Sequence, residues 1–207
     1  SNTICKKMLI DVASSEGFEL DAGSAELLAI LADGSFRDGL GELQKVLNFS
    51  KKDNKSKKII RITKEEVEAI TGAPKTALVN DFISAIAEKN IEKGMQAVQN
   101  ASEVNLDMKL YFKLIIQKFR MAIILRYASR LISDPSTTLR ASMAGDLSEA
   151  DLEFLQFLVK EDKAGMLRSP ALVILLEMYQ NIDSAFISEL PLELALVRIL
   201  EQDKETK

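Results

Sequence analysis

The 207-residue sequence contains no histidine, a single cysteine, and only nine glycines and four prolines. The lack of histidine excludes the usual zinc sites and histidine-based acid–base catalysis. A lone Cys5 excludes an internal disulfide and is typical of a reducing compartment, so we expect a cytoplasmic protein. The sequence also lacks the Gly-x-x-x-x-Gly-Lys-Ser/Thr phosphate loop and the Gly-x-Ser-x-Gly motif. We therefore expect no catalytic residue and no metal site in this chain.

The rest of the composition favours a helical protein. Hydrophobic residues make up 47% of the chain, which suffices for a real core. Helix-forming residues dominate while glycine and proline are scarce, so we expect an all-α fold. A net charge of −4 argues against a dedicated nucleic-acid-binding protein. Lys113, Lys118, Arg120 and Arg126 interrupt the longest apolar helical run, so we expect no membrane partner.

The first third of the chain, residues 3–72, shows the pattern of a small helical bundle. Helices are expected over 3–15, from a cap at Asp21 or Ser24 up to Ala32, and from Phe36 to about Phe49. The core face expected for the third helix comprises Phe36, Leu40, Leu43, Val46 and Leu47. A capping box at Thr63–Glu66 predicts a further helix to Ile70. Residues 71–74 then stop the chain's helical pattern, and we place a domain boundary there.

A lysine-rich segment, Ser50–Lys58, interrupts this bundle with five lysines and one aspartate in nine residues. Such a charge run predicts a solvated loop. The alternative is that its lysines bind DNA phosphates. The candidate nucleic-acid-binding residues are Lys51, Lys52, Lys55, Lys57 and Lys58.

The second part, residues 73–205, is predicted to be a larger helical domain. Helices 75–88 and 90–101 form an expected antiparallel pair, and Asn105 is expected to cap a long helix from Leu106 to about Ser133. That helix is apolar nearly all round. Two explanations remain open: it meets another subunit, or its own neighbours wrap it. Asp134-Pro135 is expected to start a loop that extends through Gly145.

Further helix starts are expected in this second part. Ser148 begins one helix, and a Ser169 cap with Pro170 at the first helical position begins the next. The apolar pattern of that second helix continues to Phe186. A final helix follows Leu190-Pro191, and its end, from Glu201, is expected to fray.

The turn Ala32–Asp38 carries the most specific pattern in the sequence. Gly34 can adopt the left-handed conformation that closes a helix, and Ser35 is a good N-cap for the next one. Arg37 then falls in the first helical turn, where the helix dipole disfavours a cation. Either Arg37 and the free backbone N–H groups face an anion such as a phosphate, or Arg37 pairs with Asp33 or Asp38.

The segment Gly34-Ser35-Phe36-Arg37-Asp38-Gly39-Leu40, followed by Leu43-Gln44, resembles the Gly-Ser-x-Arg-Asp-Ala-Leu segment of the gamma/tau subunit of bacterial DNA polymerase III. That subunit is the ATPase of the replicative clamp loader. The Ile-Thr-x-Glu-x-Val pattern from Ile62 resembles the close of its AAA+ lid, and Leu190–Arg198 resembles the end of its collar. Gly39 replaces the usual alanine, and Gly41 is a second unusual glycine.

The resemblance implies a lid at 3–72 and a collar, or oligomerisation domain, at 73–205. Arg37 is then the sensor-2 arginine that contacts the ATP γ-phosphate. ATP and magnesium would belong to the full-length ATPase, and no cofactor is expected in this chain, which begins without Met and which we expect to be a fragment. The implied partners are other clamp-loader subunits, the sliding clamp and primer-template DNA within the DNA polymerase III holoenzyme.

Two other interpretations stay open. The chain could be a stand-alone helical scaffold that binds protein partners without ATP, since composition and periodicity suit that role equally well. It could also be the lid and collar of another AAA+ clamp-loader relative. The Ser-Phe-Arg-Asp form of the turn favours gamma/tau.

Overall fold

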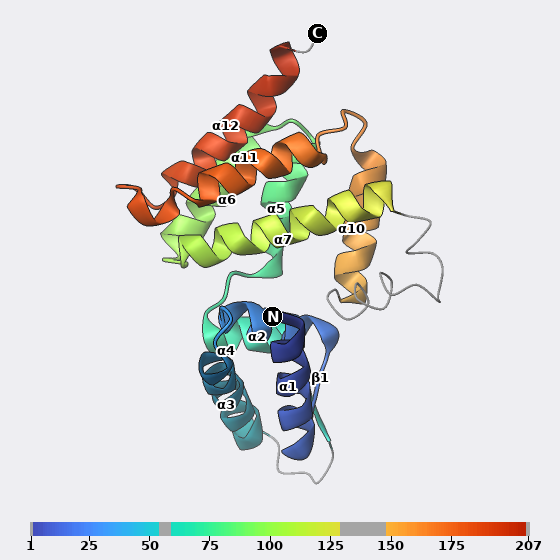
Figure 1. Ribbon diagram of the computed structural model, residues 1–207, viewed down its shortest axis with the longest axis vertical. Helices are drawn as coiled ribbons and strands as arrows, with labels where there is room; N and C mark the ends of the chain where they lie inside the picture. The colour runs from blue at the N-terminus through green and yellow to red at the C-terminus, as the bar shows by residue number, and fades with distance from the viewer. Residues whose placement is uncertain (1, 54–58, 129–147, 206–207) are drawn as a thin grey trace. The chain divides into compact units, whose positions relative to one another are not determined.

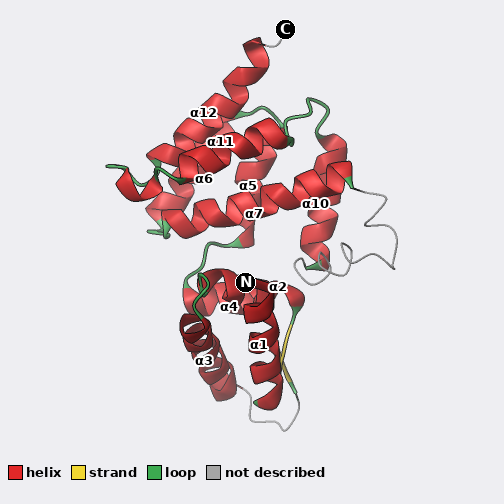
Figure 2. Cartoon of the chain, in the orientation of Figure 1, coloured by secondary structure: helices red, strands yellow, loops and turns green. Residues whose placement is uncertain are grey.

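The computed structural model describes residues 2–53, 59–128 and 148–205, and these form two compact units. Unit 1 contains the described residues up to Ala73 together with 148–151, and unit 2 contains 74–128 and 152–205. Helices make up nearly all the regular structure of both units (Figures 1 and 2). The prediction of an all-α fold is therefore confirmed. The assignment of the units as lid and collar stays a prediction.

Unit 1 is a helical bundle with one short pair of strands. Its elements in chain order are α1 (Asn2–Ser15), β1 (Phe18–Leu20), α2 (Ala22–Leu31), α3 (Phe36–Asp53), β2 (Ile60–Ile62) and α4 (Lys64–Thr71). The strands pair in parallel, with Phe18 opposite Ile60. Each of α1, α2 and α3 packs against the other two, and α4 packs against α2 and α3. Their shared core therefore fixes where α3 begins.

Local capping signals in unit 1 form as the sequence predicts. The Asp21 carboxylate accepts a hydrogen bond from the Ser24 N–H at 2.7 Å and caps α2. At α4, the Thr63 N–H donates to Glu66 at 2.8 Å and the Glu66 N–H donates to the Thr63 hydroxyl at 3.4 Å. Gly72 ends α4 in the left-handed conformation. The capping box is thus confirmed.

The lysine-rich segment differs from the expected loop. Helix α3 continues to Asp53, so the loop prediction is wrong for residues 50–53. Ser50 is buried, and the Lys51 ammonium lies 3.0 Å from a Glu16 oxygen and 5.6 Å from the centre of the Phe18 ring. These contacts with the α1–β1 region explain why the helix extends through a charged stretch. Residues 54–58 lie outside the described residues.

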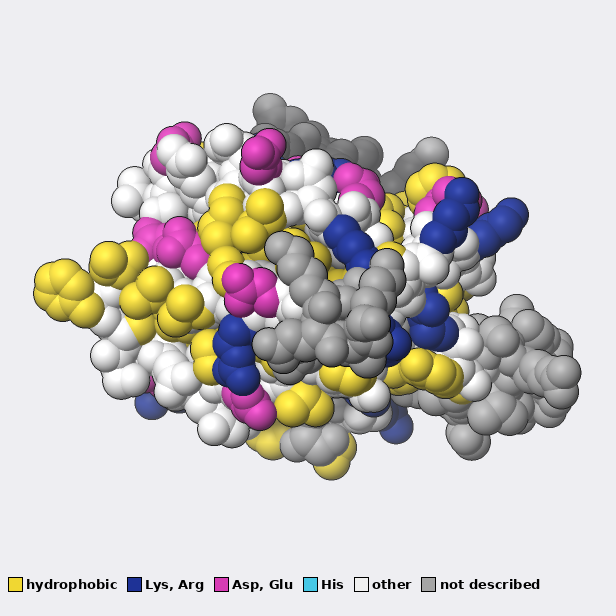
Figure 3. All heavy atoms as spheres, turned by 90° about the horizontal axis from the view of Figure 1, so that it is seen from above, with side chains coloured by type: hydrophobic (Ala, Val, Ile, Leu, Met, Phe, Trp, Pro, Cys, Tyr) yellow, Lys and Arg dark blue, Asp and Glu magenta, His cyan; other side chains and the backbone are white. Residues whose placement is uncertain are grey.

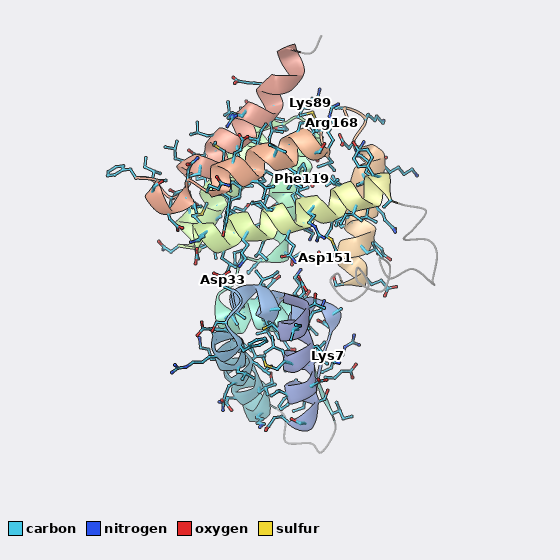
Figure 4. All side chains as sticks on the ribbon, viewed as in Figure 1. Lys7, Asp33, Lys89, Phe119, Asp151 and Arg168 are labelled. Carbon is cyan, nitrogen blue, oxygen red and sulfur yellow. The ribbon has the colours of Figure 1, made fainter. Side chains whose placement is uncertain are left out.

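Unit 2 is built from α-helices and one 3-10 helix. Its elements are α5 (Thr76–Ala87), α6 (Ile91–Glu103), α7 (Met108–Tyr127), α10 (Glu149–Glu161, from Leu152 on), α11 (Ser169–Tyr179), the 3-10 helix Ile182–Ser184 and α12 (Leu190–Glu205). Helix α7 packs against α5 and α11, while α12 packs against α6 and α11. Phe119 on α7 lies within this unit and is fully buried (Figure 4).

The long helix α7 differs from the prediction in its N-cap, and its burial bears on how its apolar residues are covered. Its N-cap is Asp107, whose carboxylate accepts from the Leu110 N–H at 3.0 Å, so the assignment of the cap to Asn105 is wrong. Asn105 instead adopts a left-handed conformation, with φ of 54°. Of the apolar residues of α7, Tyr127 alone is exposed. The helix is therefore largely wrapped by its own neighbours. Its expected continuation over 129–133, and the expected loop through Gly145, lie outside the described residues.

The later helix starts follow the sequence with small shifts. The Asp151 N–H donates to the Ser148 hydroxyl at 3.1 Å, which confirms the predicted start of α10. Arg168 rather than Ser169 occupies the N-cap position of α11, so that prediction is off by one residue. Helix α11 also ends at Tyr179, before Phe186, because a 3-10 turn intervenes. Helix α12 begins at Leu190 and continues to Glu205, beyond the expected fraying point.

Asp162 anchors the connection between α10 and α11, a role that no pattern in the sequence predicts. One carboxylate oxygen accepts from the Met166 N–H at 2.8 Å, and the other accepts from the Leu167 N–H at 2.7 Å. Arg126, in the last turn of α7, forms an ion pair with the same buried carboxylate. The connection is therefore held to α7 by a satisfied buried charge.

None of the helices in the described residues meets the length and hydropathy that a membrane crossing requires.

We predict that Gly94→Ala destabilises unit 2. A Cβ at position 94 would lie 2.4 Å from one Leu196 methyl carbon and 2.9 Å from the other, and Leu196 is fully buried against α6. Overpacking of this kind costs about 1–3 kcal/mol, so the free energy of unfolding in urea should fall by that amount. In a Leu196→Ala background, Gly94→Ala should lower the free energy of unfolding by clearly less than it does in the wild-type chain. An unchanged stability of the single variant would contradict the close approach of α6 and α12.

A second prediction concerns Glu189, which precedes α12. Hydrogen bonds from the Ser102 hydroxyl, from its own backbone and from the Ser188 hydroxyl lower the pKa of this carboxyl group. Because the folded-state pKa is lowered, the resulting stability is present above the unfolded-state pKa and is lost as pH falls through the folded value. Ser102→Ala should raise the pKa of Glu189 and reduce this loss in acid. An NMR titration of the Glu189 side chain measures the shift, and Ser188→Ala should cause a smaller one. Equal shifts would contradict the ranking of the two serines.

Candidate functional site

The turn between α2 and α3 reverses the chain through two left-handed residues. Asp33 and Gly34 have φ angles of 45° and 85°. The Ser35 N–H donates to the Ala32 carbonyl at 2.7 Å and closes the turn. Figure 4 shows Asp33 in this turn, at one end of unit 1. The left-handed Gly34 is as predicted, and glycine suits it because a side chain strains such a backbone.

Ser35 caps α3 and leaves two backbone donors free. Its hydroxyl accepts from the Asp38 N–H at 3.2 Å, and its carbonyl accepts from the Gly39 N–H at 3.0 Å. The N–H groups of Phe36 and Arg37 have no acceptor among the described residues. Unsatisfied N–H groups at a helix start carry partial positive charge and attract anions. The cap is thus confirmed, and the N–H groups of Phe36 and Arg37 remain without a described acceptor.

Arg37 is exposed beside these two donors. No carboxylate among the described residues pairs with it, and in particular Asp33 and Asp38 do not. The structure therefore does not show the ion pair that we considered as an alternative. A guanidinium next to two free N–H groups is a donor set for an anion with several oxygens, such as a phosphate. Arg37 and these donors share the first turn of α3, and the binding of an anion there stays a prediction.

The surface around Arg37 is partly apolar, which the sequence did not predict. Phe36 and Leu40 were expected in the core, but their exposures are 45% and 38%. They lie one turn apart and face the edge of the core that Leu43, Val46 and Leu47 occupy. The start of α3 therefore presents an arginine next to two apolar side chains. The spacing of apolar residues could not predict the exposure of Phe36 and Leu40, because this exposure depends on how far α1 and α2 extend beside the start of α3.

The two unusual glycines of α3 have different surroundings. A Cβ at Gly39 would lie 3.0 Å from the Ala32 Cβ and 3.4 Å from the Cys5 sulfur, so the helix approaches α1 and the end of α2 closely there. A Cβ at Gly41 would meet nothing within 4 Å. Gly41 lies one turn after Arg37 and leaves bare backbone on the same side of the helix. Gly39 is thus closely packed, whereas Gly41 faces open space.

The candidate DNA-binding lysines are only partly described. Lys51 is exposed on α3, but its ammonium already pairs with Glu16. The side chain of Lys52 and all of Lys55, Lys57 and Lys58 lie outside the described residues. The proposal that these lysines bind DNA is therefore not tested.

In the part of the chain that the structure describes, there is little support for a metal site or for a reactive cysteine or tyrosine. No group of three His, Cys, Asp or Glu side chains there could hold a metal ion. Cys5 is buried, and burial raises the pKa of its thiol, which keeps it protonated and unreactive. Tyr111 is also fully buried; its hydroxyl donates to the Leu78 carbonyl at 2.9 Å, and burial raises its pKa. These groups serve packing.

Comparison with known proteins finds a likeness to a solved structure. No protein-family model matches the chain, and no curated protein matches it in sequence. Among solved structures, the chain is similar to the Bacillus subtilis DNA clamp loader delta protein (YqeN), with a TM-score of 0.43 and 18% sequence identity. The match covers 97% of this chain and 57% of that chain, so this chain spans less than two thirds of its length. A likeness at this TM-score defines neither a family nor a function.

We predict opposite effects for alanine at the two glycines of α3. Gly41→Ala should raise the free energy of unfolding by about 1 kcal/mol, because alanine favours the helix and the position is open. Gly39→Ala should lose that gain or lower stability, since Ala32 and Cys5 must move. Urea unfolding of the two variants, followed by circular dichroism, measures the difference. Equal stabilisation by both would contradict the close packing at Gly39.

Proposed function

We propose that the chain is the lid and collar part of a clamp-loader ATPase subunit of the gamma/tau type. Unit 1 is the lid and unit 2 the collar. The observation that carries the proposal is the start of α3, where an exposed Arg37 without a described carboxylate partner lies beside two free N–H groups. The motif resemblance of residues 34–40 supplies the identity of the anion, which is the γ-phosphate of ATP.

The chemistry of the donor set fits this ligand. A guanidinium presents several N–H donors in a fixed plane and suits phosphate oxygens. The free N–H groups of Phe36 and Arg37 add the positive end of the helix dipole. Magnesium ATP, held by a nucleotide-binding domain of the whole protein, would supply the phosphate charge. No described residue group of this chain would hold the metal ion itself.

The proposed mechanism divides the work between the units. Arg37 donates hydrogen bonds to the terminal phosphate of ATP. ADP lacks that phosphate and therefore makes no contact with Arg37. The lid is therefore held in one position with ATP and released after hydrolysis, which is a shift between two states by differential contacts. The collar keeps neighbouring subunits together during this change. In the whole assembly the partners are other clamp-loader subunits, the sliding clamp and primer-template DNA.

The same proposal extends to the lysine-rich segment and to the location of the protein. We propose that Lys52, Lys55, Lys57 and Lys58 approach the DNA backbone, whereas Lys51 contributes less because Glu16 already neutralises it. A replication role, together with the lone buried Cys5, is consistent with a cytoplasmic location. The rival role, a helical scaffold without ATP, requires no ligand at Arg37.

We predict that Arg37→Ala in the whole protein lowers ATP-dependent clamp loading by about 10- to 100-fold, the loss expected from a hydrogen bond to a charged group. The stability of this chain should change by less than about 0.5 kcal/mol, because the side chain is exposed. Arg37→Lys should recover only part of the activity, since an ammonium lacks the planar donors. Loading measured by ATP-dependent clamp retention on primed DNA tests this.

Arg61→Ala provides the matched control, because Arg61 is an exposed arginine in unit 1 on β2, away from the α3 start. It should leave loading unchanged. Equal loading by wild type and Arg37→Ala would contradict the sensor role and favour the scaffold.

A further inference from the structure

Two Asp-Gly pairs lie close together where α2 gives way to α3. Asp33-Gly34 is in the turn itself, and Asp38-Gly39 is near the start of α3. Glycine has no Cβ to shield its backbone nitrogen, so the side chain of a preceding aspartate reaches that nitrogen easily. The sequence contains no other Asp-Gly pair and no Asn-Gly pair. These two pairs are therefore the positions where an aspartate side chain reacts most readily with the adjoining backbone.

The reaction of such a pair begins with the closure of a succinimide ring. The glycine nitrogen forms a bond to the aspartate Cγ, and the carboxyl OH and the amide hydrogen leave as one water molecule. Water then adds to one of the two imide carbonyls. Addition at the Cγ carbonyl restores aspartate. Addition at the main-chain carbonyl leaves the chain running through Cγ, which is isoaspartate with a free α-carboxylate. The composition returns to its starting value, so no oxidant or reductant takes part.

The structure places the two pairs in different surroundings. Asp33 and Gly34 are both exposed, and the Gly34 N–H has no acceptor among the described residues. Gly39 is buried in α3, and its N–H donates to the Ser35 carbonyl at 3.0 Å. The Asp38 N–H donates to the Ser35 hydroxyl at 3.2 Å. Ring closure at Asp38 therefore requires the start of α3 to open, whereas ring closure at Asp33 requires only movement within an exposed turn.

The backbone of Asp33 gives a second reason for reaction there. Its φ of 45° is left-handed, a conformation that is disfavoured because Cβ lies too close to the following carbonyl oxygen. In isoaspartate the Cβ becomes part of the main chain, and this crowding is removed. Figure 4 labels Asp33 in the turn. Exposure alone does not select a site, since Asp and Glu side chains lie at several places on the face that Figure 3 shows.

We propose that Asp33 is a site of spontaneous isoaspartate formation, and that the aged chain is a substrate for an S-adenosylmethionine-dependent methyltransferase that recognises isoaspartate. Such an enzyme moves a methyl group from S-adenosylmethionine to the new α-carboxylate. The ester loses methanol when the ring closes again, and hydrolysis of that ring returns part of the chain to aspartate.

Isomerisation at this position changes the turn that precedes α3. The Ser35 N–H and the Ala32 carbonyl now meet at 2.7 Å and close the turn, and isoaspartate adds one main-chain atom between them. The start of α3, and Arg37 with it, is therefore displaced in the aged chain. The chemistry needs neither nucleotide nor partner, so the inference goes beyond the proposed function and does not depend on a ligand at Arg37.

The test ages the folded chain at neutral pH and physiological temperature and follows the two pairs separately. Trypsin cleaves after Arg37 and places the pairs in different peptides, and electron-transfer fragmentation in a mass spectrometer distinguishes isoaspartate from aspartate. Isoaspartate should form at Asp33 at least about tenfold faster than at Asp38, because exposure of the Gly39 nitrogen requires a helical turn to open. In guanidinium chloride, where both pairs are unfolded, the two rates should be similar.

A purified protein L-isoaspartate methyltransferase with labelled S-adenosylmethionine gives an independent measure. Aged wild type should accept label, and freshly prepared chain should accept little. Asp33→Glu keeps the carboxylate but would have to close a larger ring, so this variant should accept almost no label after ageing. Asp38→Glu is the matched control and should accept label like wild type. Circular dichroism should show both variants folded.

Three results would overturn the proposal. The first is isoaspartate at neither position of the aged, folded chain. The second is formation at Asp38 as fast as at Asp33, which would mean that the start of α3 does not protect the second pair. The third is an aged wild-type chain that accepts no more label than aged Asp33→Glu.

Discussion

The close approach of α3 to its neighbours at Gly39 fixes the geometry on which unit 1 depends. A Cβ there would lie 3.0 Å from the Ala32 Cβ and 3.4 Å from the Cys5 sulfur, so these neighbours would have to shift by a few tenths of an ångström. Because α3 begins directly beside the end of α2, the two left-handed residues Asp33 and Gly34 suffice to reverse the chain. Arg37 then falls in the first turn, at the surface, with free N–H groups beside it.

Unit 2 depends on close contacts of the same kind. Gly94 lets α6 approach Leu196 on α12, and the buried Asp162 ties the α10–α11 connection to Arg126 on α7. Of the basic residues of α7, Lys118 is buried and Arg126 pairs with the buried Asp162, whereas Arg120 is exposed.

Local chemistry in the sequence predicted most helices and several of their caps, although it misplaced the caps of α7 and α11 by one or two residues. Ser35, Thr63 with Glu66, Gly72 and Ser148 act within a few residues of their partners, so their roles depend little on the rest of the fold. The other wrong predictions concern residues whose burial or helical state depends on packing against distant parts of the chain. Phe36 and Leu40 have core spacing yet lie at an edge, and the helix of α3 extends through Lys51 because Glu16 and Phe18 are near. The candidate site was predictable as a motif, but its apolar surroundings and the open space at Gly41 were not.

The central claim is that Arg37 contacts the terminal phosphate of ATP, and its chemical reactivity tests this most directly. Phenylglyoxal modifies exposed arginines, and peptide mass mapping of the whole protein reports each site separately. The account predicts that a non-hydrolysable ATP analogue with magnesium protects Arg37, that ADP does not, and that Arg61 reacts equally in both states. Equal modification of Arg37 with the analogue and with ADP would contradict the account.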